Sequence, residues 1–344
     1  MLRVSVLDQS ATAAGKSHQA TLQSTIALAK HCERLGYNRY WLAEHHNSPA
    51  NVGTAPEILV ASIASVTSRI RVGSAGVLLA HYAPFKVAES FRVLSAIAPG
   101  RIDLGIGRNP GGNPATIAAL SRGAPEREHG EAVEELLHWL ADDETDAATA
   151  QDESGENVRA YPRLVNGPVP WLLGTSLRSA KHAAHLGVPF CFNFSHSTNY
   201  SLSRDALDHY RAEFRPSRKF PEPVAALSVW TLAAESEEEA ERLFAPRGHW
   251  CVMLNKGIRG PMIAPELAQA QSYSVSDQAR IDQMREYSVV GSVSQVADRL
   301  RSICADHKID EIVVATWTYD AADQFRSYEL LADALDLKQE APVA

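Results

Sequence analysis

RIRVGSAGVLLAHYAPFKVAESFRVLSAIAPGRIDLGIGR occupies residues 69–108. Its first apolar run, 70–79, predicts a buried strand. Pro84 then opens a helix that runs to about residue 96, since proline is favoured in the first turn of a helix. A second apolar run at 102–107 predicts another strand. The order strand, helix, strand, with both strands apolar, indicates an α/β fold whose helices cover a mostly parallel sheet.

The same alternation recurs along the whole chain and gives about eight strand–helix units. The other expected strands are 3–8, 39–44, 170–174, 189–194, 223–233 and 311–316. The other expected helices are 18–35, 55–68, 116–140 with a break at 123–125, 176–186, 201–214, 235–244, 293–306 and 323–335. Eight units is the number in a (β/α)8 TIM barrel. We therefore predict a single TIM-barrel domain over residues 1–344, with insertions. The competing doubly wound open sheet would need a GxGxxG loop after the first strand, and SATAAGK at 10–16 does not supply it.

Two segments interrupt the alternation. Residues 142–160 are acidic and nearly free of apolar side chains, and we expect a surface excursion there. Residues 247–287 carry Gly257, Gly260, Pro261 and Pro265. This second segment is interpreted as an insertion that either closes over the site as a lid or is disordered.

Composition excludes several classes of protein. The 344 residues carry 33 Lys and Arg against 41 Asp and Glu, for a net charge of −8, which argues against a nucleic-acid binder. No apolar run approaches the ~18 residues that span a bilayer. The four cysteines are far apart, so they form neither a metal knuckle nor a redox pair and suit a reducing compartment. We expect a cytoplasmic protein that contacts neither membranes nor nucleic acid.

Polar residues at the carboxyl ends of barrel strands are candidates for a site. His45 and His46 end the second strand. Adjacent residues of an extended chain point to opposite sides, so the pair is not expected to bind a metal. We expect one histidine that handles a proton and one packed or hydrogen-bonded neighbour.

Two other strand ends suit a phosphate. Arg108 follows the fourth strand beside a glycine-rich turn, where a guanidinium and open backbone N–H groups bind an anion. Thr175, Ser176 and Ser179 begin the helix after the fifth strand, where hydroxyls and free N–H groups either bind a phosphate or simply cap the helix. Ala75 and Gly76, at the end of the third strand, are small enough for a flat ring to approach the backbone. Residues expected to line a substrate pocket are His46, His81, Tyr82, Asn193, Trp230 and Trp317.

The quoted stretch, together with YWLAEHHN at 40–47, WLLGTSLRSAKHAAHLG at 171–187 and DEIVVATWTYDAADQFRSYELLADAL at 310–335, resembles the bacterial luciferase-like flavin monooxygenases. The resemblance covers well over half of the chain. It implies a TIM barrel that receives reduced FMN from a separate NAD(P)H-dependent reductase. The bound flavin reacts with O2 to a C4a-hydroperoxide that oxygenates a small organic substrate, in a natural-product or catabolic pathway. It also implies a homodimer through the helices that begin near Ala55 and Pro84.

The resemblance also implies roles for individual residues. His45 matches the essential histidine of the family, and Ala75 and Gly76 match a pair joined by a cis peptide bond under the flavin ring. Arg108, Ser176 and Ser179 match residues that bind the flavin phosphate. Thr175 stands where luciferase has a glutamate, so that contact with the flavin does not transfer directly. Gly107 stands where luciferase has a reactive cysteine, so a thiol-dependent role does not transfer.

Three alternatives remain open at this point. The same fold serves hydride-transfer enzymes that use the deazaflavin F420. Some relatives of luciferase bind flavin without catalysis. A metal-dependent hydrolase on a barrel is remote, because the sequence lacks the necessary set of histidines and carboxylates.

Overall fold

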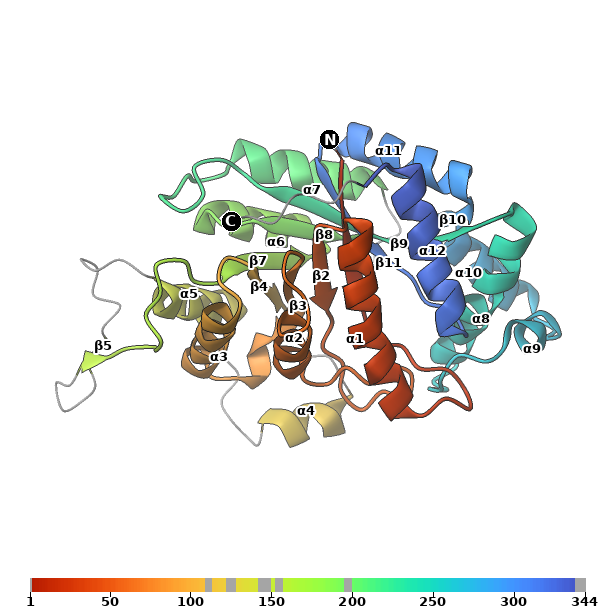
Figure 1. The fold of residues 1–344 in the computed structure, drawn as a ribbon, viewed down its shortest axis with the longest axis horizontal. Helices are drawn as coiled ribbons and strands as arrows, with labels where there is room; N and C mark the ends of the chain where they lie inside the picture. The colour runs from red at the N-terminus through yellow and green to blue at the C-terminus, as the bar shows by residue number, and fades with distance from the viewer. Residues whose placement is uncertain are drawn as a thin grey trace.

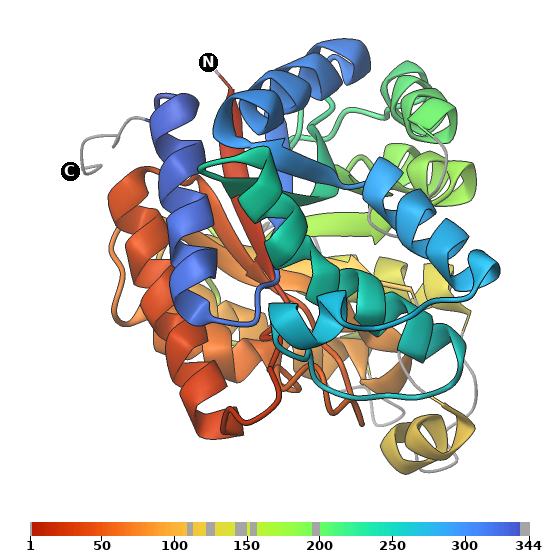
Figure 2. The ribbon, with the colours of Figure 1, turned by 90° about the vertical axis from the view of Figure 1, so that its right-hand side faces the viewer.

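A computed structural model describes residues 2–108, 113–121, 128–141, 150–151, 157–194 and 200–337. Eight parallel strands form a closed barrel, which confirms the predicted fold class (Figures 1 and 2). Their order around the barrel is β1 (Arg3–Asp8), β2 (Arg39–Leu42), β3 (Arg71–Leu78), β4 (Ile102–Gly107), β7 (Val169–Gly174), β8 (Phe190–Asn193), β9 (Ala225–Ala234) and β11 (Glu311–Ala315). Pairing of β11 with β1 and of β8 with β9 closes the ring.

Helices surround this barrel, as the two views show. They are α1 (His18–Leu35), α2 (Pro56–Ala64), α3 (Pro84–Ile97), α5 (His129–Leu140), α6 (Leu177–Leu186), α7 (Tyr200–Ala212), α8 (Glu237–Asn255), α11 (Val293–His307) and α12 (Ala321–Ala334). Shorter elements are η1 (Leu79–His81), α4 (Pro114–Ser121), α9 (Pro265–Gln269), α10 (Val275–Glu286) and the strands β5 (Ala150–Gln151), β6 (Asn157–Val158) and β10 (Val289–Ser292). Among the described residues, no helix combines the length and the apolar character that crossing a membrane requires.

Each strand buries side chains on both of its faces, in two separate apolar layers. On β11, Ile312 and Val314 pack between the strands and the helices. Val313 and Ala315 alternate with them and point into the lumen of the barrel. The strands are therefore apolar on both faces, and this is why the sequence shows continuous apolar runs rather than alternation.

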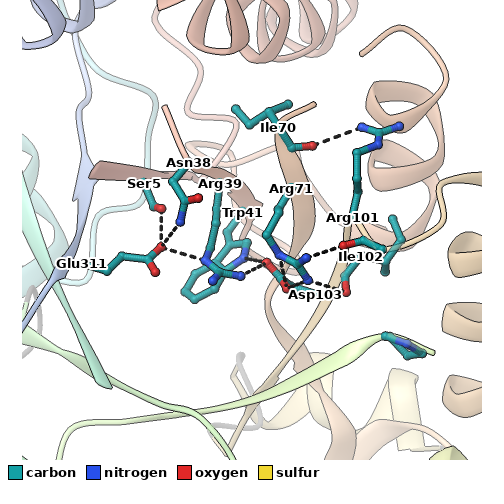
Figure 3. Close-up of polar contacts among 12 residues, drawn as sticks. Ser5, Asn38, Arg39, Trp41, Ile70, Arg71, Arg101, Ile102, Asp103 and Glu311 are labelled. Atoms are coloured by element: carbon teal, nitrogen blue, oxygen red, sulfur yellow. Dashed lines mark hydrogen bonds and ion pairs between the residues drawn. The ribbon is translucent and has the colours of Figure 1, made fainter. Parts of the chain in front are cut away.

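The floor of the lumen, at the amino ends of the strands, is polar (Figure 3). Arg39 lies 2.8 Å from a carboxylate oxygen of Asp103 and 2.7 Å from one of Glu311. Arg71 reaches the other oxygen of Asp103 at 2.5 Å, and the Trp41 indole donates to Asp103 at 3.0 Å. Because these buried charges pair inside the barrel, the floor is closed by ion pairs.

One of the two alternatives for the second interruption is wrong. The segment 247–287 is helical rather than disordered: α8 continues past Pro246 to Asn255, and α9 and α10 pack against it. A further strand, β10, follows and pairs with the end of β9. Most of 142–160 lies outside the described residues, although β5 and β6 within it pair antiparallel. The helical stretch expected at 116–140 with a break at 123–125 is two helices, α4 and α5, as predicted, although residues 122–127 lie outside the described part of the chain.

Candidate functional site

His45 lies just beyond β2, at the carboxyl edge of the barrel. Trp41 and Ala43 point into the lumen, and His45 is two residues further on the same side of the extended chain. Its Nε2 is 3.3 Å from Nε2 of Gln9, which follows β1. The Gln9 amide donates to this nitrogen when the imidazole proton is on Nδ1. The strand register thus directs one half-buried histidine to the mouth of the lumen.

The two neighbours of His45 point the other way. Glu44 is buried, and its Oε1 lies 2.7 Å from Nε2 of His46 and accepts a hydrogen bond from the Tyr82 hydroxyl at 2.6 Å. Its Oε2 accepts the backbone N–H of Leu78 at 2.9 Å. Burial, and then the hydrogen bond to Glu44, raise the pKa of Tyr82. Tyr82 is therefore a neutral donor at physiological pH, and His46 is held by a carboxylate.

The wall between these histidines and β4 is built from small residues. The peptide bond between Ala75 and Gly76 is cis, as the resemblance implies. A Cβ on Gly76 would lie 2.8 Å from the carbonyl oxygen of Gly105 and from the N–H nitrogen of Gly107. Ala75 packs against the apolar cluster of the lumen. Glycine is thus required at residue 76, because β4 leaves no room there for a Cβ.

A pocket of about 300 Å³ opens beside the end of β4. Arg108, Arg178, Ser179, His129 and His182 are among its lining residues. Burial, and then the charges of His182 and Arg108, lower the pKa of His129 to about 4. Burial also lowers the pKa of His182. The pocket is of mixed charge, because Glu128, Glu131 and Glu134 also line it and Glu128 pairs with Arg178 at 3.2 Å.

The serines expected at this pocket also cap α6. The Ser176 hydroxyl accepts the backbone N–H of Ser179, and Ser179 Oγ accepts the N–H of Ser176, each at 3.3 Å. Gly174 has no room for a Cβ beside Ser179. The two serines thus cap the N-terminus of α6 in the free protein. Ser179 also lines the pocket at Arg108. Thr175 is exposed beside them and is not among the residues that line the pocket.

The remaining expected pocket residues fall into two groups. His81 lies near Tyr82 and pairs through Nδ1 with the Ser121 hydroxyl at 3.1 Å, on the side of Glu44. Trp230 and Trp317 are buried in the lumen cluster. Asn193 ends β8 in register with Ser228 of β9, in the inward-facing row that includes Cys191 and Ala226. His45, Ala75, Asn193 and the two tryptophans therefore share the lumen, whereas His46, His81 and Tyr82 lie outside it.

Sequence reasoning missed Arg247, Gln9 and His129 as members of the site. Arg247 is buried, with its Cζ 4.2 Å from the ring of Trp230 and 5.1 Å from that of Trp317. Nothing in its local sequence marks it, because α8 brings it over the barrel only in the folded chain. Gln9 is the first residue after β1, and its position at a strand end was an available signal.

The family model for luciferase-like monooxygenases matches residues 2–310. The chain belongs to the luciferase-like monooxygenase family. N-acetyl-S-alkylcysteine monooxygenase of Bacillus subtilis is 36% identical over 337 residues, covering 97% of this chain and 98% of that protein. The crystal structure of apo-MsnO8 superposes with a TM-score of 0.86 at 36% identity, covering 98% and 99% of the two chains.

Proteins of lower identity are described with different cofactors. The oxygenating constituent of 3,6-diketocamphane monooxygenase from Pseudomonas putida, solved with FMN, has a TM-score of 0.70 at 19% identity and covers 97% of this chain and 98% of its own. The F420-dependent tetrahydromethanopterin reductase of Methanopyrus kandleri has a TM-score of 0.67 at 14% identity, covering 97% and 98%. The oxygenase component of the flavin-dependent trigonelline monooxygenase of Acinetobacter baylyi is 23% identical, covering 80% and 78%. The two distant structures show the fold alone.

This luciferase-like monooxygenase is an oxidoreductase. Within the part of the chain that the structure describes, no three His, Cys, Asp or Glu side chains form a group that could hold a metal ion.

Proposed function

We propose that this protein is an FMNH2- and O2-dependent monooxygenase that oxygenates a small organic substrate. The observation that carries the proposal is the position of Ala75 and Gly76 at the end of β3. Ala75 packs against the lumen cluster, and Gly76 lies against Leu173, which lines the pocket at Arg108. A ring and a phosphate joined by a short chain match these two features. Reduced FMN, when bound, supplies the electrons that activate O2.

Residues of the pocket fit the phosphate of FMN. Arg108 contributes a guanidinium and Ser179 a hydroxyl, and the N-terminus of α6 contributes its positive dipole end. We propose that Ser176 and Thr175 complete this set, which requires Ser176 to exchange part of its capping bond for the ligand. Ala75 and Gly76 would carry the ring on the lumen side.

His45 is the proposed catalytic residue. Its imidazole lies at the mouth of the lumen, and Gln9 fixes its orientation by the contact at Nε2. An imidazole held in this way can act as a general base toward substrate or as a general acid toward an oxygen atom. The apolar lumen excludes water around it, which favours oxygen transfer over unproductive release.

The flavin is proposed to arrive from a separate NAD(P)H-dependent reductase, as the name of the Acinetobacter relative suggests for that protein. Because the B. subtilis relative is named for N-acetyl-S-alkylcysteine, N-acetyl-S-methylcysteine is the first substrate to supply. Purified protein, a flavin reductase, NADH, FMN and 18O2 should give a product that carries one 18O atom. A product free of 18O, or no product from a panel of organic acids and thioethers, would reject the proposal.

The F420-dependent alternative has a direct test. Equilibrium titrations with FMN, reduced FMN and F420 should show reduced FMN bound at least about tenfold more tightly than F420. The opposite order would favour hydride transfer. A non-catalytic flavin-binding protein would bind FMN and fail to accelerate its reoxidation or to oxygenate any substrate.

We further propose a homodimer, a lid and a cytoplasmic location. Ile58 on α2 and Val93 and Ile97 on α3 expose large apolar side chains on two helices that pack together. The segment 247–287 is proposed to select substrate, because α8 carries Arg247 to the lumen. The four cysteines are free, which suits a reducing cytoplasm.

A further inference from the structure

Arg247 is a buried cation that has no counter-ion in the described part of the chain. It lies on α8 with only 7% of its surface exposed. Its Nε has no hydrogen-bond partner, and it forms no ion pair with any described carboxylate. Burial lowers the pKa of its guanidinium, and only the nearby Cys251 thiol opposes this.

Such an arrangement is costly in a free protein. A buried ion loses its hydration, and in most proteins a paired carboxylate compensates for the loss. Here the compensation comes only from the rings of Trp230 and Trp317, which the guanidinium overlies at 4.2 and 5.1 Å. Ring contacts of this kind satisfy the faces of the guanidinium and leave its in-plane N–H groups available for an acceptor.

Other buried hydrogen-bonding groups of the lumen also lack partners in the described structure. The indole N–H of Trp230, the indole N–H of Trp317 and the hydroxyl of Ser228 are all buried and unpaired in the described structure. Buried polar groups are normally satisfied, so a cluster of unpaired groups beside an unpaired cation indicates a missing ligand. Three of these four groups can only donate, and the ligand they fit is therefore an acceptor with negative charge.

This cluster shares the lumen with the proposed catalytic residues. Trp230 and Trp317 belong to the same apolar cluster that Ala75 packs against. Trp250, one turn of α8 from Arg247, packs edge-on against Trp317 at 5.0 Å. A ligand held at Arg247 would thus have its anionic end among tryptophans and its apolar part in the lumen near Ala75.

We propose that Arg247 binds the carboxylate of the organic substrate, so that the enzyme acts on small organic acids. A guanidinium binds a carboxylate through two parallel hydrogen bonds, and the indole N–H groups can contact the same oxygens. The identification of this ligand as the substrate rests on the proposed function. The anion site itself rests only on the unpaired cluster, and its test needs no turnover.

Two matched pairs of ligands test this site by calorimetry, with and without saturating FMN. They are N-acetyl-S-methylcysteine with its carboxamide, and hexanoate with hexanamide. In wild-type protein each acid should bind at least about tenfold more tightly than its amide, as expected for hydrogen bonds to a charged group. Arg247→Met should remove this preference by weakening the acids, with amide affinity changed less than about threefold, and Arg247→Lys should lose part of it. Arg280→Met, which removes an exposed guanidinium from α10, is the matched control and should behave as wild type.

Thermal melting distinguishes loss of the anion site from a folding defect in the variant. Because an unpaired buried charge destabilises the free protein, Arg247→Met should melt at or above the wild-type temperature. Either acid should raise the melting temperature of wild type and of Arg280→Met, but not that of Arg247→Met.

Three results would overturn the inference: acids and amides that bind wild type equally, acids that do not bind at all, and an Arg247→Met variant that loses FMN affinity while keeping its preference for acids. The last result would assign the guanidinium to the flavin ring. A protein that binds the acids through Arg247 but neither binds reduced FMN nor incorporates 18O would refute the proposed function and support the anion site.

Discussion

The carboxylate of Glu44 lies 2.7 Å from Nε2 of His46, and both side chains are largely withdrawn from solvent at the end of β2. The same carboxylate accepts from Tyr82 and from the backbone of Leu78. One buried acid therefore ties the end of β2 to the segment that follows the cis peptide bond. This contact holds the loop that shapes one side of the mouth.

Removing the carboxylate should destabilise the fold. Glu44→Ala leaves three donors unpaired and should lower the free energy of unfolding by about 2–4 kcal/mol. Glu44→Gln keeps an acceptor and should cost about 1–2 kcal/mol. Urea unfolding measures both. Glu241→Ala, which breaks an exposed pair with Arg285, is the control and should cost less than about 1 kcal/mol. Equal losses in Glu44→Ala and the control would contradict this role.

Asp103 makes stability depend on pH in the acid range. Burial by itself raises the pKa of Asp103, but the charges of Arg39 and Arg71 more than offset it and hold the pKa below 3.8. The stabilisation from these ion pairs is thus fully present above the unfolded pKa of about 3.9 and is lost as pH falls through the lower folded pKa.

The urea midpoint measured between pH 7 and pH 2 tests this expectation. Asp103→Asn should unfold more easily than wild type at pH 7, by about 3–5 kcal/mol, because it removes the buried charge that Arg39 and Arg71 share and leaves Arg39 with Glu311 alone. The difference should shrink below about pH 4, because the unfolded wild-type chain then takes up a proton at Asp103 that the folded chain binds only at lower pH. A difference that stays constant down to pH 2 would argue against the ion pairs as its source.

His129 should report the binding of the flavin phosphate. With its pKa lowered to about 4, the imidazole is neutral at pH 7 in the free protein. A phosphate beside Arg108 adds negative charge that favours the protonated ring, so FMN should raise the pKa of His129. NMR titration of the ring measures the midpoint. Riboflavin, which lacks the phosphate, is the control, and an equal upward shift with riboflavin would place the phosphate elsewhere.

His45 should be needed for turnover and not for flavin binding. His45→Ala should lower kcat by about 10²–10⁴-fold, the range of a lost general acid or base. Its dissociation constant for FMN should change less than about threefold, because the phosphate pocket is intact. His209→Ala on α7 is a control remote from the lumen and should match wild type. A His45→Ala variant with wild-type turnover would show that His45 is not a catalytic residue.

The exposed apolar side chains of α2 and α3 should mediate dimerisation. Ile58 and Ile97 are 63% and 54% exposed, and a charge at either position would be buried in the proposed interface. Light scattering should show a dimer for wild type and a monomer for Ile58→Asp or Ile97→Asp. Ile258→Asp is a matched control, since Ile258 is 56% exposed beyond the end of α8. A dimer unaffected by the first two variants would place the interface elsewhere.

The sequence by itself determined the barrel, because eight apolar runs separated by helices can be buried on both faces in few other ways. It also indicated that His45 and His46 point to opposite sides, because side chains alternate along an extended chain. Arg108 and Ser179 were predictable together, since the ends of neighbouring parallel strands meet at one edge of the barrel.

Only the tertiary structure decided which histidine has a carboxylate partner and where the unpaired charge lies. Glu44 reaches Tyr82 because β3 ends beside β2, a register that local sequence does not encode. In the sequence, Arg247 is one of many charged residues, and it begins a segment in which no helical or strand periodicity is evident. It becomes informative because α8 buries it against Trp230 of β9 and against Trp317, which follows β11. Burial and the absence of a partner are properties of the folded chain, and the proposed anion site rests on them.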